Sequence, residues 1–222
     1  MRKIFVSLFA FLFAVSLYAQ SEVESMSIDA IMDACLEMQE AIENDNPEAL
    51  AKAAAKMRES GTTPFNSLRC LDESKADNSL DGHFVFSEAF VDSLQNDANA
   101  YENADKINQD AVRSSTKRGQ TANGSILTKT CLVKAGQSTR YSFPSKGRQE
   151  LGIVAEPGGL VAVRIHATNK DGLDEWHNDT KNPKGTRRFK TAFDLPKDKR
   201  NTVELEVINK SPKDISFVVI SN

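Results

Sequence analysis

The stretch that decides the fold is Val161-Ala162-Val163-Arg164-Ile165-His166-Ala167-Thr168, in which apolar and polar residues alternate. A period of two is typical of a β-strand with one buried and one wet face. The segment from Arg188 to Leu195 alternates in the same way, with Phe189, Thr191 and Phe193 on one side. Both stretches therefore predict half-buried strands, and the alternation places His166 on the outward side.

Five further segments resemble these two strands, and they lie on either side of them in the chain: Thr128–Lys134, Thr139–Phe143, Glu150–Ala155, Thr202–Ile208 and Ile215–Ser221. The sequence Pro157-Gly158-Gly159 between two of the strands has the composition of a tight reversing turn. No helical period interrupts the series. Residues 125–222 are therefore predicted to form an antiparallel, jelly-roll-like β-sandwich of about seven strands.

The first half of the chain has a helical period instead. A stripe of apolar residues predicts a helix from about Ser27 to Glu43, and Asn46 and Pro47 are typical of the start of a second helix that ends before Gly61. The short turn between them predicts an antiparallel hairpin. Ser87 is a candidate cap for a third, long helix, whose buried face continues to Tyr101 and whose second half beyond Tyr101 is polar. The sequence thus predicts an α+β protein of two segregated domains, helical at 20–113 and β-sandwich at 125–222, joined by a linker at 114–124.

Charge changes at the same border. The chain has 222 residues, 27% of them charged, and a net charge of -3. From Gln20 to Arg118 there are 20 acidic and 9 basic residues, whereas from Gly119 to Asn222 there are 11 acidic and 17 basic residues. This asymmetry is consistent with two independently composed domains, with domains that attract each other, or with a basic face for an anionic partner.

The N-terminal residues have the pattern of a secretory signal peptide. Arg2 and Lys3 precede an apolar run from Ile4 to Leu17, and Ala19 is a small residue suited to a cleavage site. We expect residues 1–19 to be removed and the protein to be exported to the periplasm or the cell surface. The apolar run is shorter than the roughly 20 residues that cross a bilayer, so no transmembrane segment is expected in the mature chain.

The sandwich half resembles the pre-peptidase C-terminal type of β-sandwich that is appended to secreted bacterial proteins. The resemblance rests on Gly136 to Phe143 with its Tyr141, the strands around Pro157-Gly158-Gly159, and the terminal pair from Asn209 to Asn222. It implies an accessory, binding or solubilising module, and some domains of that type bind calcium.

The cysteine count leaves one residue without a partner. Cys35 and Cys70 both lie in the first half and are predicted to form a disulfide in an oxidising compartment, although a buried free thiol at Cys35 competes with this pairing. Cys131 lies on a strand, as a core residue or, alternatively, in an intermolecular bridge.

Candidate binding chemistry concentrates in and after the polar segment from Asn169 to Gly185. Hard oxygen ligands for calcium are available there, from Asn169, Asp171, Asp174 and Glu175, although the spacing does not match a twelve-residue calcium loop. An ordinary solvated loop is the alternative. The candidates for binding an anionic glycan, a lipid head group or an extracellular protein are one aromatic residue, its neighbour and the basic residues that follow: Trp176, His177, Lys181, Lys184, Arg188 and Lys190. Nucleic acid is not expected as a partner of an exported protein.

No catalytic motif is present in the sequence. The three histidines, His83, His166 and His177, have neither metal-ligand nor triad spacing, and no nucleophile elbow or phosphate-binding glycine loop occurs. The sequence therefore predicts a non-enzymatic binding or structural accessory protein. The alternative is a secreted hydrolase whose site is assembled at the interface between the domains.

Overall fold

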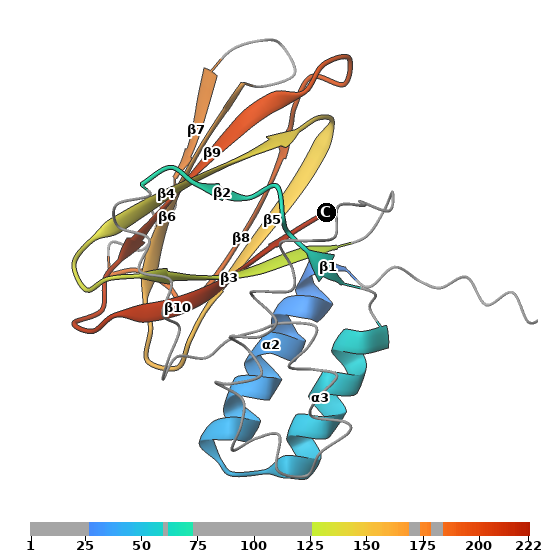
Figure 1. The fold of residues 1–222 in the computed structure, drawn as a ribbon, viewed down its shortest axis with the longest axis vertical. Helices are drawn as coiled ribbons and strands as arrows, with labels where there is room; N and C mark the ends of the chain where they lie inside the picture. The colour runs from blue at the N-terminus through green and yellow to red at the C-terminus, as the bar shows by residue number, and fades with distance from the viewer. Residues whose placement is uncertain (1–26, 60–61, 73–125, 169–173, 179–183) are drawn as a thin grey trace, which may run out of the picture.

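A computed structural model describes residues 27–59, 62–72, 126–168, 174–178 and 184–222 of the chain. In these ranges the protein is a two-layer β-sandwich with a helical hairpin against one sheet (Figure 1). The candidate signal peptide at 1–19, the third helix that begins at Ser87 and the linker at 114–124 lie outside the described residues. No helix among the described residues is long and apolar enough to span a membrane.

The predicted helical hairpin is confirmed. Helix α2 spans Ile28–Glu43, and the Ser27 side chain caps it by accepting a hydrogen bond from the Ala30 N–H at 3.3 Å. Helix α3 spans Pro47–Glu59, where Asn46 accepts from the Ala49 N–H at 3.0 Å. Proline is tolerated at the first helical position because no carbonyl is available there for the missing N–H to bond. The capping residues Ser27 and Asn46, together with Pro47, therefore account for where the two helices begin.

The seven strands predicted from the period of two are all present. They are β3 (Leu127–Val133), β4 (Ser138–Ser145), β5 (Arg148–Ala155), β6 (Val161–Thr168), β8 (Arg188–Asp194), β9 (Asn201–Asn209) and β10 (Ile215–Ser221). The Pro157-Gly158-Gly159 turn is present too, with Gly158 at a φ of 72° and a hydrogen bond from the Gly159 N–H to the Glu156 carbonyl. A positive φ suits glycine because it has no Cβ.

Three of the described strands were not predicted from the sequence: β1 (Thr63–Pro64), β2 (Arg69–Cys70) and β7 (Asp174–Asn178). Sheet A has the order β1-β3-β10-β5-β8, and sheet B has the order β2-β4-β9-β6-β7. Pairing is antiparallel except between β1 and β3. A strand of two residues carries too little alternation to be recognised as a strand, which explains why β1 and β2 were missed.

Helix α2 covers the outer face of sheet A. Ile28, Met32 and Cys35 belong to one apolar cluster with Val154 of β5 and Val218 and Ile220 of β10. Strand β10 is consequently buried at each of its seven residues, and Figure 1 shows the hairpin lying against this layer. The middle of sheet A, at β10 and the second half of β5, is therefore buried on both faces, whereas β8 keeps exposed residues.

Residues 62–72 connect the hairpin to both layers of the sandwich. Strand β1 pairs with β3 in sheet A, and β2 pairs with β4 in sheet B. Between them Phe65 and Leu68 enter the sandwich core, where the rings of Phe65 and Phe143 meet edge to face at 5.1 Å. Residues 62–72 thus supply two strands and two core residues to the β-sandwich. An α+β fold with a β-sandwich is observed, but segregation into two domains is not confirmed.

Candidate functional site

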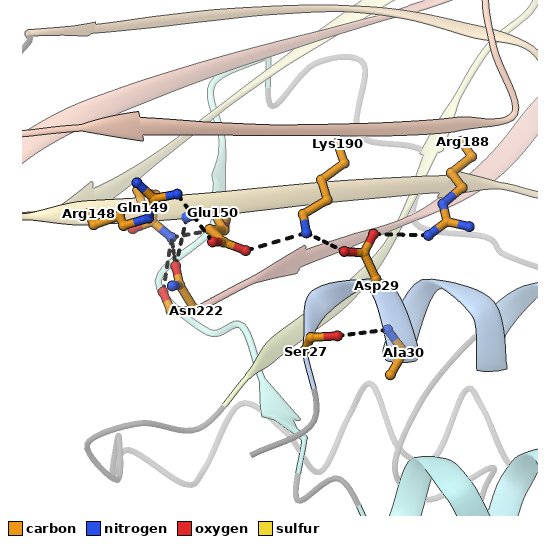
Figure 2. A network of polar contacts seen from close by, with 9 residues as sticks. All are labelled: Ser27, Asp29, Ala30, Arg148, Gln149, Glu150, Arg188, Lys190 and Asn222. Carbon is orange, nitrogen blue, oxygen red and sulfur yellow. Dashed lines mark hydrogen bonds and ion pairs between the residues drawn. The ribbon is translucent and has the colours of Figure 1, made fainter. Parts of the chain in front are cut away.

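Two of the predicted binding residues lie against the helical hairpin. In Figure 2 the Lys190 ammonium stands between the carboxylates of Asp29 on α2 and Glu150 on β5. The Lys190 Nζ lies 2.5 Å from Asp29 Oδ2 and 3.5 Å from Glu150 Oε2. Arg188 contacts Asp29 Oδ1 at 3.0 Å and Asp33 Oδ1 at 2.5 Å. We refer to Asp29, Asp33, Arg188 and Lys190 as the helix-docking cluster.

The electrostatics of the helix-docking cluster follow from these contacts. The hydrogen bond from Lys190, aided by Arg188, lowers the pKa of Asp29 below its ordinary value. The same hydrogen bond raises the pKa of Lys190. Each charged form is thus stabilised by its partner. Beside the cluster, the Arg187 guanidinium donates to the amide oxygen of Gln39, which is fully buried. The basic surplus at the start of β8 therefore holds the acidic helix against the sheet.

The remaining candidates for the binding site do not form a described cluster. Lys184 is exposed ahead of β8. Lys181 lies outside the described residues. Trp176 and His177 belong to β7, where Trp176 occupies the register position opposite His166 and His177 the position opposite Ile165. The predicted grouping of these residues with Arg188 and Lys190 is not tested by the structure.

The calcium ligands are likewise untested. Asn169 and Asp171 lie outside the described residues, while Asp174 and Glu175 lie in β7, opposite Thr168 and Ala167. Among the residues that the structure describes, no group of three or more histidine, cysteine, aspartate or glutamate side chains could hold a metal ion.

The predicted Cys35–Cys70 disulfide is wrong, because all three cysteines are free. Cys35 lies between α2 and the outer face of sheet A, whereas Cys70 lies on β2 and packs against the sandwich core. The prediction assumed that a helical hairpin would bring the two residues together, but residues 62–72 leave the hairpin and join the sheets. Cys131 is a buried core residue of β3, which agrees with the first of the two alternatives given for it.

The outer face of sheet B is a second polar surface. Arg140, Glu206 and Arg164 stand opposite one another across β4, β9 and β6. Arg164 Nη1 lies 3.4 Å from Glu206 Oε2, and Arg140 Nη2 lies 3.2 Å from Asp72 Oδ1. Both arginine side chains are more than half exposed, at 56% for Arg140 and 55% for Arg164.

A second row of residues lies on the same face, two residues away from the first row on each strand. It consists of residues paired directly across β2, β4, β9, β6 and β7: Arg69, Ser142, Glu204, His166 and Trp176. His166 Nδ1 lies 4.0 Å from Glu204 Oε2. The outward position predicted for His166 is confirmed, since its side chain is partly exposed. We refer to these two rows together as the sheet B face.

Sequence analysis found only part of the sheet B face. The alternation in β6 identified Arg164 and His166 as outward residues, and the alternation in β9 would have done the same for Glu204 and Glu206. What the sequence lacks is the strand order. Arg140 and Arg164 are brought to the two sides of Glu206 only because β9 lies between β4 and β6.

A catalytic site at the interface between helices and sheet finds no support in the described residues. The contact between α2 and sheet A is filled by apolar side chains. A shallow depression of about 290 Å³ lies on the hairpin itself, lined by residues that include Glu37, Lys52 and Lys56. It contains none of the candidate residues.

Comparisons with known proteins give only a distant fold similarity. No family model matches the chain, and no curated protein matches its sequence. Among solved structures, the Yersinia pseudotuberculosis-derived mitogen aligns with 44% of this chain and 85% of its own, at 9% identity and a TM-score of 0.31. The Salmonella Typhimurium periplasmic lysozyme inhibitor PliG aligns with 47% of this chain and 93% of its own, at 12% identity and a TM-score of 0.31.

A carbohydrate-binding module is also similar to this chain. TmCBM61, solved with beta-1,4-galactotriose, aligns with 47% of this chain and 86% of its own, at 9% identity and a TM-score of 0.29. Similarity at this level says nothing about what the present chain binds. The resemblance to pre-peptidase C-terminal sandwiches stays a prediction.

Proposed function

We propose that this protein is an exported, non-enzymatic binding module whose ligand surface is the sheet B face. The observation that carries the proposal is the difference between the two sheets. Helix α2 covers the middle of the outer face of sheet A, while the outer face of sheet B presents exposed charged side chains from β4, β9 and β6. Charged side chains aligned on one face of a sheet offer many donors and acceptors to one extended ligand.

The charge balance of this surface favours a neutral ligand over an anionic one. Its arginines, Arg69, Arg140 and Arg164, are matched by carboxylates at Asp72, Glu204 and Glu206. Arg188 and Lys190, the basic residues expected to bind an anion, are already paired with Asp29 and Asp33 on α2. A polyhydroxylated ligand such as a neutral glycan can donate to the carboxylates and accept from the guanidinium groups at the same time.

The register position of Trp176 adds to this proposal. Residues directly opposite in a ladder share a face of the sheet, and position 176 stands opposite His166. An aromatic residue at the end of a row of polar side chains is suited to a sugar, which has both an apolar ring face and hydroxyl groups.

The test is a screen of the protein against neutral and acidic glycans, followed by calorimetry with the best ligand. Arg164→Ala, Glu204→Ala and Trp176→Ala should each weaken binding about tenfold or more. Arg148→Ala, on the outer face of sheet A, is the matched control and should leave the affinity unchanged. Binding to a neutral glycan should also be insensitive to salt. Absence of binding to every glycan, or equal affinity for all four variants, would contradict the proposal.

Export is tested separately by mapping the N-terminus of the protein isolated from its host. Cleavage after Ala19 should leave a chain that begins at Gln20. An intact Met1 to Ala19 segment in the isolated protein would remove the argument for export and leave the binding proposal standing.

A further inference from the structure

We propose that the outer edge of β8 is a self-association site, at which two copies of the chain pair antiparallel through Arg188–Asp194 and join their A sheets. Strand β8 is the last strand of sheet A, and no strand among the described residues pairs with its second edge. An uncovered strand edge offers a row of N–H and C=O groups that a second strand can bond.

The hydrogen bonds of the sandwich identify which groups face that edge. The Ala155 N–H donates to the Arg187 carbonyl at 2.8 Å, and the Leu195 N–H donates to the Gly147 carbonyl at 2.8 Å. Because bonded pairs alternate along an antiparallel ladder, the odd-numbered residues of β8 bond β5. The backbone groups of Lys190, Ala192 and Asp194 therefore point away from the sheet. The Arg188 N–H and carbonyl, which share that direction, are bonded by the Thr186 hydroxyl.

The sequence of β8 is complementary to itself in one antiparallel register. With Thr191 on the twofold axis, Lys190 stands opposite Ala192 of the second copy and Arg188 opposite Asp194. Lys190 of one copy and Ala192 of the other would then exchange backbone hydrogen bonds. These are the residues whose N–H and C=O groups point out of the edge. Opposite charges meet at both ends of the strand, which stabilises a cross-strand pair. A register centred on Lys190 would instead put two lysines opposite each other, which is unfavourable.

The charge that would normally protect this edge is neutralised. Lysine on an edge strand discourages pairing because two lysines repel each other. Here the Lys190 ammonium lies 2.5 Å from Asp29 Oδ2 and 3.5 Å from Glu150 Oε2. Its repulsion toward a second strand is therefore reduced by the same contacts that dock α2.

The helical hairpin leaves room for a second copy. Helix α2 presents Asp29 and Asp33 toward β8, and these side chains are about half exposed, at 49% and 54%. Ala34 and Ala41, which are buried with the residues of α3, lie on the opposite flank of α2 by helical spacing. Helix α3 therefore lies on the side of α2 away from the β8 edge.

The test is sedimentation velocity on the whole chain, as its host processes it, from about 1 µM to about 1 mM. The parent protein should shift from one chain to two as the concentration rises. Ala192→Pro removes an N–H that β5 does not use, so it should raise the dissociation constant about tenfold or more while leaving the circular dichroism unchanged. Ala192→Ser keeps the N–H and should associate like the parent protein.

A cross-link tests the register without relying on proline. Thr191→Cys places two thiols opposite each other at the twofold axis, in a pair without backbone hydrogen bonds, where the strands approach most closely. Oxidised glutathione should convert this variant to a covalent dimer faster than Ala192→Cys, and faster than the parent protein. A single-chain mass throughout the concentration range, or equal cross-linking of both variants, would overturn the proposal.

Discussion

The Lys190 ammonium on β8 lies 2.5 Å from the Asp29 carboxylate on α2, across 161 positions of sequence. This ion pair joins the acidic half of the chain to the basic half. The charge asymmetry visible in the sequence therefore corresponds, at least in part, to attraction between the helical hairpin and the sheet it covers. Among the described residues, α2 thus packs on the outer face of sheet A, whereas the outer face of sheet B presents exposed charged side chains.

Removing the ion pair should loosen the helix without unfolding the sandwich. We expect Lys190→Ala and Asp29→Asn each to lower the free energy of unfolding by about 0.3 to 1 kcal/mol, because both side chains are partly exposed and screened by solvent. A double-mutant cycle in chemical denaturation should give a coupling energy that decreases with added salt. Lys52→Ala, on the exposed side of α3, is the control and should change stability little. Strictly additive effects would show that the pair contributes nothing.

The pH dependence of this contact follows from the pKa shifts. The pKa of Asp29 is lowered from 3.8, so its contribution to stability is present above 3.8 and is lost as the pH falls through the lowered value. The pKa of Lys190 is raised from 10.5, so its contribution is present below 10.5 and is lost as the pH rises through the raised value. The stability difference between the parent protein and Asp29→Asn should therefore be constant at neutral pH and shrink below pH 3.8. A difference that grows in acid would contradict this assignment.

Gly152 on β5 sets how closely α2 can approach sheet A. A Cβ at this position would lie 2.7 Å from the Met32 sulfur and 2.9 Å from Cγ2 of Ile28. We expect Gly152→Val to destabilise the protein by about 1 to 3 kcal/mol in thermal or chemical unfolding, because α2 must move away or side chains must leave their rotamers. Ala162→Val, on the outer face of sheet B, is the matched control and should be nearly neutral. Equal stability of the two variants would show that α2 does not pack on Gly152.

The three thiols should differ in reactivity. Burial raises the pKa of Cys35 to about 12 and that of Cys131 to about 11, so neither forms a thiolate near neutral pH. Cys70 is partly exposed. Iodoacetamide should therefore modify Cys70 first in the native protein, and Cys35 and Cys131 only after denaturation. Peptide mapping without reduction checks this order, and a Cys35–Cys70 disulfide in the map would contradict it.

Local patterns predicted both described helices and seven of the described strands, but not the arrangement of these elements. The caps at Ser27 and Asn46 and the alternation in β6 act over a few residues, and the corresponding elements were predicted correctly. The pairing of β1 with β3 and of β2 with β4 depends on contacts across about 70 positions, and two-residue strands have no period to reveal them. The same limitation made the Cys35–Cys70 pairing appear reasonable, since nearness in sequence was taken for nearness in space.

The sheet B face was hidden for a related reason. Arg164 and His166 were recognised as outward residues, but they have no evident function until β9 is placed beside β6. Arg188 and Lys190 attracted attention because they are close together in a basic stretch. Their actual partners, Asp29 and Asp33, lie in the other half of the chain, and no local pattern connects them.

The most direct test of the central claim, that ligand binds the sheet B face, is to map backbone amide chemical shifts by NMR during titration with the neutral oligosaccharide selected in the glycan screen. The account predicts that the perturbed amides belong to β4, β9 and β6, around Arg140, Glu204 and His166, with those of α2 unchanged. Perturbations that concentrate on α2 and β8, around Asp29 and Lys190, would contradict it.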